Sequence, residues 1–516
     1  MIVILLMIIE ALMSRYRTAL SLLALTSFLV ATPAWSEPGK TRQAADIDAF
    51  VRRAMATVGT VPGLSLAVVA GEDAVIVGGY GVADVESRHP VDADTAFYIA
   101  SATKSFTALA IARMGERGEV SLDEPLSRWA GNSALPTDQS ATVTLTDLLS
   151  HQSGLSNEAM GYRLAFSGQH TPTVLQGLLA LTTMNAEAPR GTFQYTNIGY
   201  NIATTLIEGR FGQSWQTLVR DEVLVPAGMT RTTAFISQAR QTDTVATGHL
   251  AYSAAAASPS PLQKVDETMQ SAGGLVSTAR DMARWLEVQI NDGELDGRQV
   301  FPPGLVASTH RARVAQDRTF GRYHRDGYGL GWQTGRYGDD VLIHHFGNFG
   351  GSRAHVSFMP ERRLGVAVMV NEDLVTGELA DLVANYVYDR FADLPDIDAR
   401  YDALLAEMVA TRDRRLAALT AAREERAARP SMLSRPLAAY VGIYDNPAMG
   451  TLVIDQENGH LVVQSGVMSA ISEPATDAES IRVELVPMQG QTITFGAEDL
   501  TFDGHVFVRR QGVRRS

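Results

Sequence analysis

Apolar runs and polar turns alternate through the first part of the main body of the chain, and their lengths indicate which elements to expect. Two apolar runs, at 64–69 and 74–77, flank the polar segment 71–73, which begins with glycine. Short apolar runs on both sides of such a segment are typical of a β-hairpin. This region is therefore predicted to supply two paired strands.

Further along, the spacing of apolar residues becomes helical and then returns to that of strands. Apolar residues recur at helical spacing over 106–114, with Gly118 as the stop, and again over 279–290. Two late runs, 354–358 and 364–370, are strand-like. Strands at both ends with helices between them predict an α+β domain whose sheet is completed by both ends of the domain.

The last part of the chain has a different pattern. Residues 401–429 place leucines and a methionine among arginine and glutamate residues, which predicts a charged amphipathic helix that Pro430 ends. Short strand-like runs follow, and Asn-Gly at 458–459 and Asp-Gly at 503–504 are typical hairpin turns. Residues 431–516 are therefore predicted to form a small all-β domain, a barrel or a sandwich.

The amino-terminal residues have the pattern of an export signal. The apolar run 18–31 follows the basic residues Arg15 and Arg17, and Ala-Trp-Ser at 34–36 is a small-x-small cleavage pattern. The basic leader is best explained if translation starts at Met13. The expected localisation is periplasmic or secreted, with no stable membrane span after cleavage. An uncleaved membrane anchor is the alternative.

These patterns divide the chain into four predicted parts. Residues 1–36 form the signal peptide, 37–395 the α+β domain, 396–430 a helical linker and 431–516 the all-β domain. A chain of 516 residues is long enough for more than one domain, so the division agrees with the length.

Composition removes several classes of function. The formal net charge is −13, whereas a nucleic-acid-binding protein normally presents a basic surface to phosphates, so no nucleic-acid partner is expected. Cysteine is absent, which excludes disulfide scaffolds, cysteine nucleophiles and thiolate metal sites. Lysine occurs only at positions 40, 104 and 264, so a lysine within a motif is informative here.

The strongest chemical pattern is Ser-x-x-Lys, formed by Ser101 and Lys104 at the start of the first predicted helix. Positions i and i+3 share one helix face, so the lysine amine can reach the serine hydroxyl. The helix amino terminus offers N–H groups to a developing oxyanion, and apolar neighbours favour the neutral amine, which can act as a base. A surface lysine on a capped helix is the alternative.

A second pattern places Tyr195 and Asn197 two residues apart, where both side chains can point the same way from an extended segment. The tyrosine can relay a proton and the asparagine amide can hold a substrate carbonyl. The pattern alone is weak, because Tyr444 and Asn446 also match it. That second match is interpreted as a turn before Pro447.

The third pattern is His-His-Phe-Gly-Asn-Phe-Gly-Gly at 344–351, predicted to lie just before a strand. A glycine-rich strand edge can approach a substrate closely and donate N–H groups to it. His344 and His345 could instead suggest a metal site, but neighbouring residues of a strand face opposite ways. We therefore expect one histidine in the site and no metal.

In this order the three patterns resemble the serine beta-lactamase-like family of penicillin-recognising enzymes. That family includes class C beta-lactamases, D-alanyl-D-alanine carboxypeptidases, D-aminopeptidases and esterases. The resemblance covers roughly residues 44–390 and is supported by segments 148–155, 273–278 and 329–332. It implies the beta-lactamase/DD-peptidase-like fold, an antiparallel sheet flanked by helices. His151, inside the first of these segments, is expected to be structural.

The resemblance also implies a role for each residue of the three patterns. Ser101 is then the nucleophile, Lys104 its base partner and Tyr195 the proton relay. The implied substrate-binding residues are Asn197, His345, Gly347 and Asn348. By the same resemblance, the backbone N–H groups of Ser101 and Asn348 would form the oxyanion hole.

Phe346 departs from the family pattern. Many beta-lactamases and carboxypeptidases have threonine there, and its hydroxyl helps to hold the substrate carboxylate. Phenylalanine offers no hydrogen bond, so we expect weak or absent turnover of beta-lactams and C-terminal D-alanine substrates.

The all-β part carries a weaker likeness. Tyr-Val-Gly-Ile-Tyr at 440–444, followed by Gly450, resembles the small lipocalin-like barrels appended to some D-aminopeptidase-like members of the family. No second copy of the catalytic set occurs there, so the domain is expected to shape access or assembly rather than chemistry.

The expected function is that of a secreted serine hydrolase that forms an acyl-enzyme on Ser101. It would cleave esters or the amide bonds of peptides, including D-amino-acid or otherwise unusual peptides. A beta-lactamase or DD-carboxypeptidase is one alternative, and a sensor that captures beta-lactams or peptides without turnover is another. No metal or organic cofactor is expected, the partner is a small-molecule or peptide substrate, and the oligomeric state stays open.

Overall fold

The computed structural model describes residues 38–131 and 133–511. The predicted signal peptide at 1–36 lies outside the described residues. From residue 44 onward the described residues form one packed unit. Within the described ranges no helix combines the length and the apolar character that crossing a bilayer requires.

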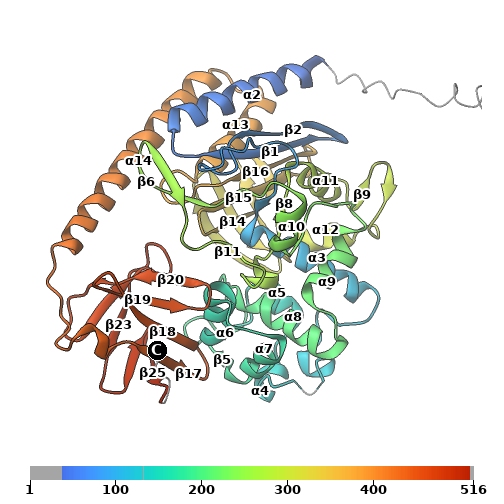
Figure 1. Cartoon of the computed structure of the whole chain (residues 1–516). Coiled ribbons are helices and arrows are strands. Elements are labelled where there is room, and N and C mark those ends of the chain that lie inside the picture. The colour runs from blue at the N-terminus through green and yellow to red at the C-terminus, as the bar shows by residue number, and fades with distance from the viewer. Residues whose placement is uncertain (1–37, 132, 512–516) are drawn as a thin grey trace, which may run out of the picture. The chain divides into compact units, whose positions relative to one another are not determined.

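The larger sheet has eight antiparallel strands, and both ends of the α+β region contribute to it (Figure 1). In spatial order the strands are β11 (Val314–Phe320), β12 (Tyr323–Tyr328), β13 (Gln333–Tyr337), β14 (Asp340–Phe349), β15 (Ser352–Met359), β16 (Leu364–Val370), β1 (Gly63–Ala70) and β2 (Asp73–Gly81). The early β1 lies beside the late β16, which confirms the predicted sheet.

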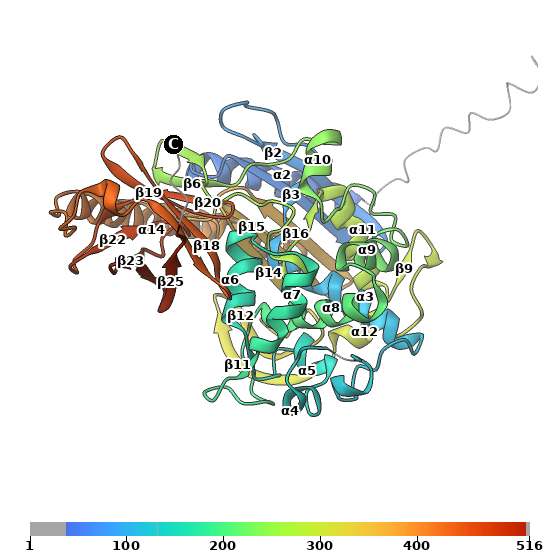
Figure 2. The ribbon, with the colours of Figure 1, turned by 60° about the horizontal axis from the view of Figure 1, so that its bottom comes forward.

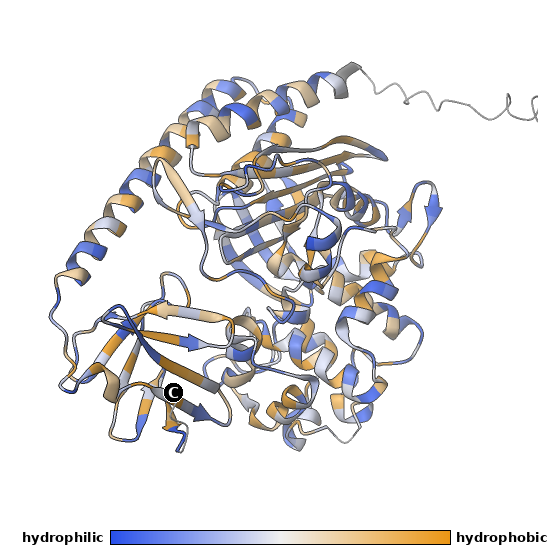
Figure 3. Cartoon of the chain, in the orientation of Figure 1, coloured by the Kyte–Doolittle hydropathy of each residue, from blue (hydrophilic) through white to orange (hydrophobic). Residues whose placement is uncertain are grey.

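Helices cover both faces of this sheet because its central strands alternate two sets of apolar side chains. Leu64 and Leu66 of β1 pack with α2 (Pro38–Val58) and α13 (Leu379–Phe391). On the other face lie α3 (Thr103–Glu116) and α11 (Ala279–Ile290), against Ala67 and Val69. Figure 2 shows this layered order, and in Figure 3 apolar colour runs along the central strands. The helices predicted over 106–114 and 279–290 are confirmed.

The remaining helices and short strands lie between the two halves of the sheet in sequence, and two of these helices, α9 and α12, pack directly on α3. The helices are α4 (Thr137–Ser140), α5 (Leu145–Leu149), α6 (Glu158–Tyr162), α7 (Pro172–Leu178), α8 (Ile198–Phe211), α9 (Trp215–Val219), α10 (Ile236–Thr242) and α12 (Leu305–His310). The strands are β3 (Phe97–Tyr98), β4 (Leu155–Ser156), β5 (Thr183–Met184), β6 (His249–Ser253), β7 (Ala256–Pro259), β8 (Val276–Ser277), β9 (Glu294–Leu295) and β10 (Arg298–Gln299).

A long helix, α14 (Ile397–Ala427), follows α13 and begins four residues before the predicted start at 401. Its Tyr401 and Leu405 join the core under the larger sheet, whereas Leu416 packs on Ala251 and Val375. Most of its other side chains are exposed and many of these are charged, which gives the mixed colouring of this helix in Figure 3. The helix therefore has a narrow apolar stripe, as its sequence predicts.

The C-terminal part is all β, as predicted. Nine strands form one sheet in the order β20-β19-β18-β17-β25-β24-β23-β22-β21. Their bounds are β17 (Gly442–Asn446), β18 (Gly450–Glu457), β19 (His460–Ser465), β20 (Met468–Ile471), β21 (Glu473–Pro474), β22 (Ser480–Val483), β23 (Gln491–Phe495), β24 (Asp499–Phe502) and β25 (His505–Arg509). The two outermost strands, β20 and β21, are consecutive in the chain, so the sheet curls into a nearly closed barrel.

The hairpin turns of the barrel are those that the sequence predicts. Asn458 and Gly459 both have positive φ, at 47° and 82°, and so do Asp503 and Gly504, at 47° and 78°. Two consecutive residues with positive φ are the signature of a type I′ turn, which asparagine, aspartate and glycine accommodate best. Local turn chemistry therefore sets these hairpins.

The barrel packs against the segment around α6 through a polar seam. Arg163, which is buried, donates hydrogen bonds to the backbone carbonyls of Pro447 and Ala448. Tyr162 donates to Ser465 Oγ at 2.7 Å, and its ring lies 5.9 Å from that of Phe502. The barrel is thus fixed to the α+β region by side chains as well as by α14.

Candidate active site

Ser101 lies in a single 3₁₀ turn, η1 (Ala100–Ala102), directly before α3. The sequence pattern predicts it inside the first turn of the helix, and the structure places it one step earlier. Ala100 has a φ of 42°, a left-handed conformation that is unfavourable for alanine. Non-glycine residues with positive φ are often found at functional sites, where the surrounding structure holds them.

Strand β14 passes very close to this turn at Gly347. A Cβ atom on Gly347 would lie 2.1 Å from the Ile99 carbonyl oxygen and 2.9 Å from the Ser101 nitrogen. Neither backbone atom can move away easily, so only glycine permits this approach. The glycine therefore brings the edge of β14 against the residue that carries the candidate nucleophile.

Lys104 is completely buried, and its amine reaches three oxygen atoms. Nζ lies 3.1 Å from Ser101 Oγ, 2.7 Å from Asn197 Oδ1 and 2.7 Å from the Ala272 carbonyl oxygen. Burial lowers the pKa of Lys104 well below its usual value, because removing the amine from water disfavours the charged form. The structure thus joins Ser101, Lys104 and Asn197 around one amine.

Tyr195 and Asn197 both lie near this amine, but the backbone conformation that positions them differs from the prediction. Tyr195 precedes α8 in a loop, whereas Asn197 has helical dihedral angles (φ −77°, ψ −21°) at the cap of α8. The prediction of one extended segment is therefore wrong for Asn197. The Tyr195 ring centroid is 5.0 Å from Lys104 Nζ. The Tyr195 side chain is 41% exposed, so it is accessible from the cavity, while desolvation raises the pKa of its hydroxyl and the Ser101 side chain lowers it in part.

His151 supports the loop that carries Tyr195. Its Nδ1 accepts a hydrogen bond from the Thr196 backbone N–H at 3.3 Å, and its carbonyl oxygen accepts one from Gln194 N–H at 2.8 Å. The His151 and Tyr195 rings lie 4.4 Å apart. Burial lowers the pKa of His151 well below its usual value, so the ring is neutral. These contacts are those of a residue that positions the loop.

The histidine pair lies within β14, and the pattern 344–351 ends directly before β15, the strand that the sequence predicts there. Because the strand ladder continues from Asp340 to Phe349, the glycines at 350–351 form the turn that follows. His345 faces the site, and its Nε2 lies 3.1 Å from the Tyr328 hydroxyl. Burial lowers the pKa of His345 to about 3. The described residues contain no group of three or more metal-ligating side chains.

Phe346 and His344 point away from His345, as expected for neighbours on a strand. The rings of Phe346 and His355 are stacked at 4.5 Å, and Phe346 also borders the site cavity. His344 Nε2 accepts a hydrogen bond from Arg325 Nε at 3.0 Å. Position 346, where the family resemblance implies a threonine hydroxyl, is therefore apolar here.

These residues enclose a cavity of about 410 Å³. The predicted residues that line it are Ser101, Tyr195, His345, Gly347 and Asn348, whereas Lys104 and Asn197 do not line it and are connected to it through Ser101. The other lining residues are Phe193, Gln316, Arg318, Phe320, Arg325, Gln333, Phe346 and Arg353.

The sequence did not predict the side of this cavity that β11 and β12 form. Gln316, Arg318 and Phe320 come from β11, and Arg325 comes from β12. Their segment has neither a clear alternation of apolar residues nor a family motif. Arg318, two residues before Phe320, was the one available signal, and its place beside Arg325 is defined only once the hairpin is folded.

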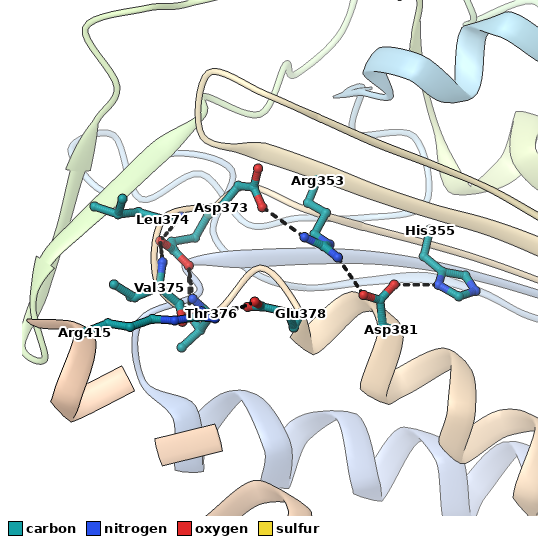
Figure 4. Close-up of polar contacts among 10 residues, drawn as sticks. Arg353, His355, Asp373, Leu374, Val375, Thr376, Glu378, Asp381 and Arg415 are labelled. Carbon is teal, nitrogen blue, oxygen red and sulfur yellow. Dashed lines mark hydrogen bonds and ion pairs between the residues drawn. The ribbon is translucent and has the colours of Figure 1, made fainter. Parts of the chain in front are cut away.

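Arg353 is held by internal carboxylates (Figure 4). Its Nη2 lies 2.6 Å from Asp381 Oδ2 and its Nη1 3.5 Å from Asp373 Oδ1. Asp381 in turn accepts a hydrogen bond from His355 Nδ1 at 2.8 Å. Burial raises the pKa of Asp373 to about 7, while Arg353 and Asn348 lower it in part. This network connects the Asn348 edge of the site with α13.

Solved structures share this fold. The octameric penicillin-binding protein homologue from Pyrococcus abyssi aligns with a TM-score of 0.57 and 22% identity, over 90% of this chain and 99% of that one. The D-amino acid amidase from Ochrobactrum anthropi SV3 in its complex with L-phenylalanine aligns with a TM-score of 0.55 and 22% identity. That alignment covers 69% of this chain and 98% of that one.

The fold and the serine–lysine site together define a serine-nucleophile enzyme architecture. The chain belongs to the family described as Beta-lactamase, which matches residues 47–386. Among curated proteins, it is 25% identical over 429 residues to "Unguisins hydrolase ungD" of Aspergillus violaceofuscus, covering 78% of this chain and 75% of that protein. It is also 23% identical to "Protein flp" of Staphylococcus aureus, over 61% of this chain and 60% of that protein.

Proposed function

We propose that the protein is a serine hydrolase that forms an acyl-enzyme on Ser101 and cleaves esters or peptide amide bonds. The observation that carries this proposal is the 3.1 Å approach of the buried Lys104 amine to the Ser101 hydroxyl. Membership of the Beta-lactamase family and the hydrolase name of the fungal relative support it.

The neutral form of Lys104 explains the hydrogen bonds of its amine. A neutral amine has two hydrogens and one lone pair. The two hydrogens serve Asn197 Oδ1 and the Ala272 carbonyl oxygen, both at 2.7 Å, and the lone pair then faces Ser101 Oγ. Lys104 accepts the Ser101 proton as the serine oxygen attacks the substrate carbonyl.

The remaining groups serve charge and proton transfer. The Ser101 and Asn348 backbone N–H groups stabilise the oxyanion, as the family resemblance implies, and the close approach of Gly347 keeps the two segments together. Tyr195, whose raised pKa keeps its hydroxyl protonated, gives its proton to the leaving group and is reprotonated by the Lys104 ammonium. Water then attacks the acyl carbonyl in place of the leaving group, gives its proton to Lys104, and Ser101 recovers a proton as the acid is released.

The enzyme should hydrolyse peptides or esters faster than beta-lactams, because the ring of Phe346 replaces the expected hydroxyl beside the cavity. A panel of purified-enzyme assays tests this with short peptides of both chiralities, esters and nitrocefin. We expect at least one ester or peptide to be hydrolysed faster than nitrocefin. Faster nitrocefin hydrolysis than that of every other compound would contradict the choice.

A covalent probe tests the nucleophile directly. An acylating active-site probe followed by peptide mass spectrometry is expected to label Ser101, and repeated turnover of a chromogenic ester is expected. Label on another serine contradicts the assignment. A single stoichiometric burst without turnover identifies a trap or sensor instead.

We further propose that the enzyme is exported, on the strength of the basic leader, the apolar run 18–31 and the pattern at 34–36. The expected mature protein begins at Glu37. Amino-terminal sequencing of the protein from an exporting bacterial host checks this. A chain that keeps Met13 and sediments with membranes would favour the anchor.

A further inference from the structure

A second cavity lies between α7, α8 and α9 and the loop 266–270 (Figure 2). Its volume is about 330 Å³, within the range of small-molecule sites. Among the described residues, none lines both this cavity and the one that contains Ser101. The two cavities are therefore separate places on the α+β domain.

The lining of this second cavity is acidic. The described residues that line it include Glu208, Asp266 and Glu267 but no arginine or lysine. In residues 38–131 and 133–511 none of these three carboxylates forms an ion pair. Burial lowers the pKa of His170, which also lines the cavity, so its ring adds no positive charge. The cavity therefore has a negative charge that the protein itself does not balance.

The nearby basic side chains are engaged elsewhere. Burial lowers the pKa of Lys264 to about 8, against the opposing effect of Asp266 and Glu267, and its amine donates to the Val265 carbonyl oxygen. Arg163 donates from all three guanidinium nitrogens to backbone carbonyl oxygens. Neither side chain therefore supplies the cation that the cavity lacks.

Two buried polar side chains of α8 also line the cavity and keep polar atoms free. Thr205 is only 5% exposed and Asn201 only 3%. Among the described residues the Thr205 hydroxyl has no hydrogen-bond partner, and neither has Asn201 Nδ2, whereas Asn201 Oδ1 accepts from Ser271 Oγ at 3.0 Å. Neither free atom is one of the unpaired side-chain atoms that are sealed from solvent, so both are reached through the cavity. Buried polar groups are normally paired, so these two atoms are places for a ligand to bind.

The free polar groups lie in one row along α8. Asn201, Thr205 and Glu208 follow each other at positions i, i+4 and i+7, which share one helix face. At 1.5 Å per residue, the outer two Cα atoms are about 10 Å apart, a span that one small ligand bridges with its two ends. The row places a carboxylate at one end and an amide donor at the other.

Apolar side chains form much of the remaining lining. Trp215 and Phe235 contribute aromatic rings, and Leu164 and Leu175 contribute aliphatic groups. The Trp215 indole N–H donates to Gln270 Oε1, which fixes the orientation of the ring. The cavity therefore accepts an apolar group beside its polar row.

We propose that this cavity binds a small organic cation, namely a protonated amine that carries an apolar group and a carbonyl oxygen. Charge-assisted hydrogen bonds from the ammonium group go to Glu208 and the carboxylates near it. The carbonyl oxygen accepts from Asn201 Nδ2, which is a donor only. The apolar group packs on Trp215, whose ring face also attracts a cation. A metal ion fits less well, because the described residues contain no group of three or more metal-ligating side chains.

Matched ligands test the need for a positive charge. Titration calorimetry compares both enantiomers of phenylglycine amide with phenylacetamide, which differs only in lacking the amine. The protein is the full chain with Ser101→Ala, so that no ligand is consumed, at about pH 6, where an α-amine is protonated. At least one enantiomer is expected to bind about 10-fold more tightly than phenylacetamide, the scale of a hydrogen bond to a charged group.

Variants assign this preference to the cavity. Glu208→Gln with Glu267→Gln keeps the shape of both side chains and removes two charges, so the ratio of the two affinities should fall to within about threefold. Glu116→Gln is the matched control, because Glu116 is an exposed glutamate in the last turn of α3, as Glu208 is in the last turn of α8. It should leave the ratio unchanged. Circular dichroism and thermal melting confirm that each variant is folded.

The experiment requires no turnover, so its outcome is independent of the proposed hydrolase function. Loss of the preference in the double variant, with the control unchanged, supports the cation site. A preference that survives in the double variant places the amine elsewhere, as in the Ser101 cavity, and overturns the proposal. Equal affinity for the amine and the neutral ligand overturns it too, as does saturable binding of Ca²⁺ without binding of the amine.

Discussion

The surroundings of Lys104 and those of Lys264 differ in one decisive feature, although both lysines are buried. Lys104 Nζ lies within hydrogen-bond distance of the Ser101 hydroxyl. Lys264 Nζ donates to the Val265 carbonyl oxygen at 2.8 Å and lies 5.5 Å from the centroid of the Tyr98 ring. Burial lowers the pKa of both amines, that of Lys264 to about 8.

The comparison teaches that a depressed lysine pKa is not sufficient for catalysis. Desolvation disfavours any buried ammonium, whether or not a reacting group is near it. A base also needs a proton donor in reach, and only the Lys104 region has one in a cavity open to a substrate. Substitutions at the two sites should therefore have very different consequences.

The largest expected effect is at the nucleophile. Ser101→Ala removes the oxygen that attacks the substrate, so kcat should fall by at least about 10⁴-fold, to near the background rate. Hydrolysis of a chromogenic ester measures it. Retention of more than about a tenth of the activity would mean that another residue is the nucleophile.

The second-largest loss of activity is expected at the general base, Lys104. Lys104→Ala should lower kcat/KM by at least about 10³-fold, the scale for losing a general base or nucleophile partner. Lys264→Met is the matched control, because it also removes a buried amine but leaves the Ser101 hydroxyl with its partner. Its kcat/KM should stay within about threefold of the wild type. Comparable losses in both variants would break the distinction between the two regions.

The pH dependence of stability gives a smaller effect, located at Lys264. Its pKa is about 8 in the folded protein and 10.5 in the unfolded chain, so between these values the unfolded chain binds the extra proton. The free energy of unfolding should therefore rise with pH from 8 to 10.5, by about 3 kcal/mol relative to Lys264→Met. Urea unfolding of both proteins across this range measures the difference. Parallel curves would show that Lys264 keeps its ordinary pKa.

The smallest effect on activity is expected at the barrel seam. Arg163→Ala leaves two barrel carbonyls without their partner, which should cost about 1–3 kcal/mol in unfolding free energy. Arg163 does not line the site cavity, so kcat/KM for a small ester should stay within about threefold. Arg52→Ala, at an exposed ion pair with Asp48, is the control and should leave the free energy of unfolding essentially unchanged. A loss of small-ester activity in folded Arg163→Ala would connect the barrel to the chemistry.

The sequence by itself determined the elements whose causes are local. Apolar spacing located α11 and the strands β15 and β16, and Asn-Gly and Asp-Gly located two barrel hairpins. The Ser-x-x-Lys spacing brought Ser101 and Lys104 together because three residues make almost one helical turn. Each of these outcomes depends on neighbours in the chain, so the sequence contains its cause.

Tertiary structure decided what depends on residues far apart in the chain. Three features of the site have no signature in a single segment. They are the hydrogen bond from the Lys104 amine to the Ala272 carbonyl oxygen, the helical cap at Asn197, and the close approach of Gly347 to Ser101. The same is true of the guanidinium pair of Arg318 and Arg325, which arises from strand register. Burial and the electrostatic field at a site are sums over many distant groups, so they become defined only when the chain is folded.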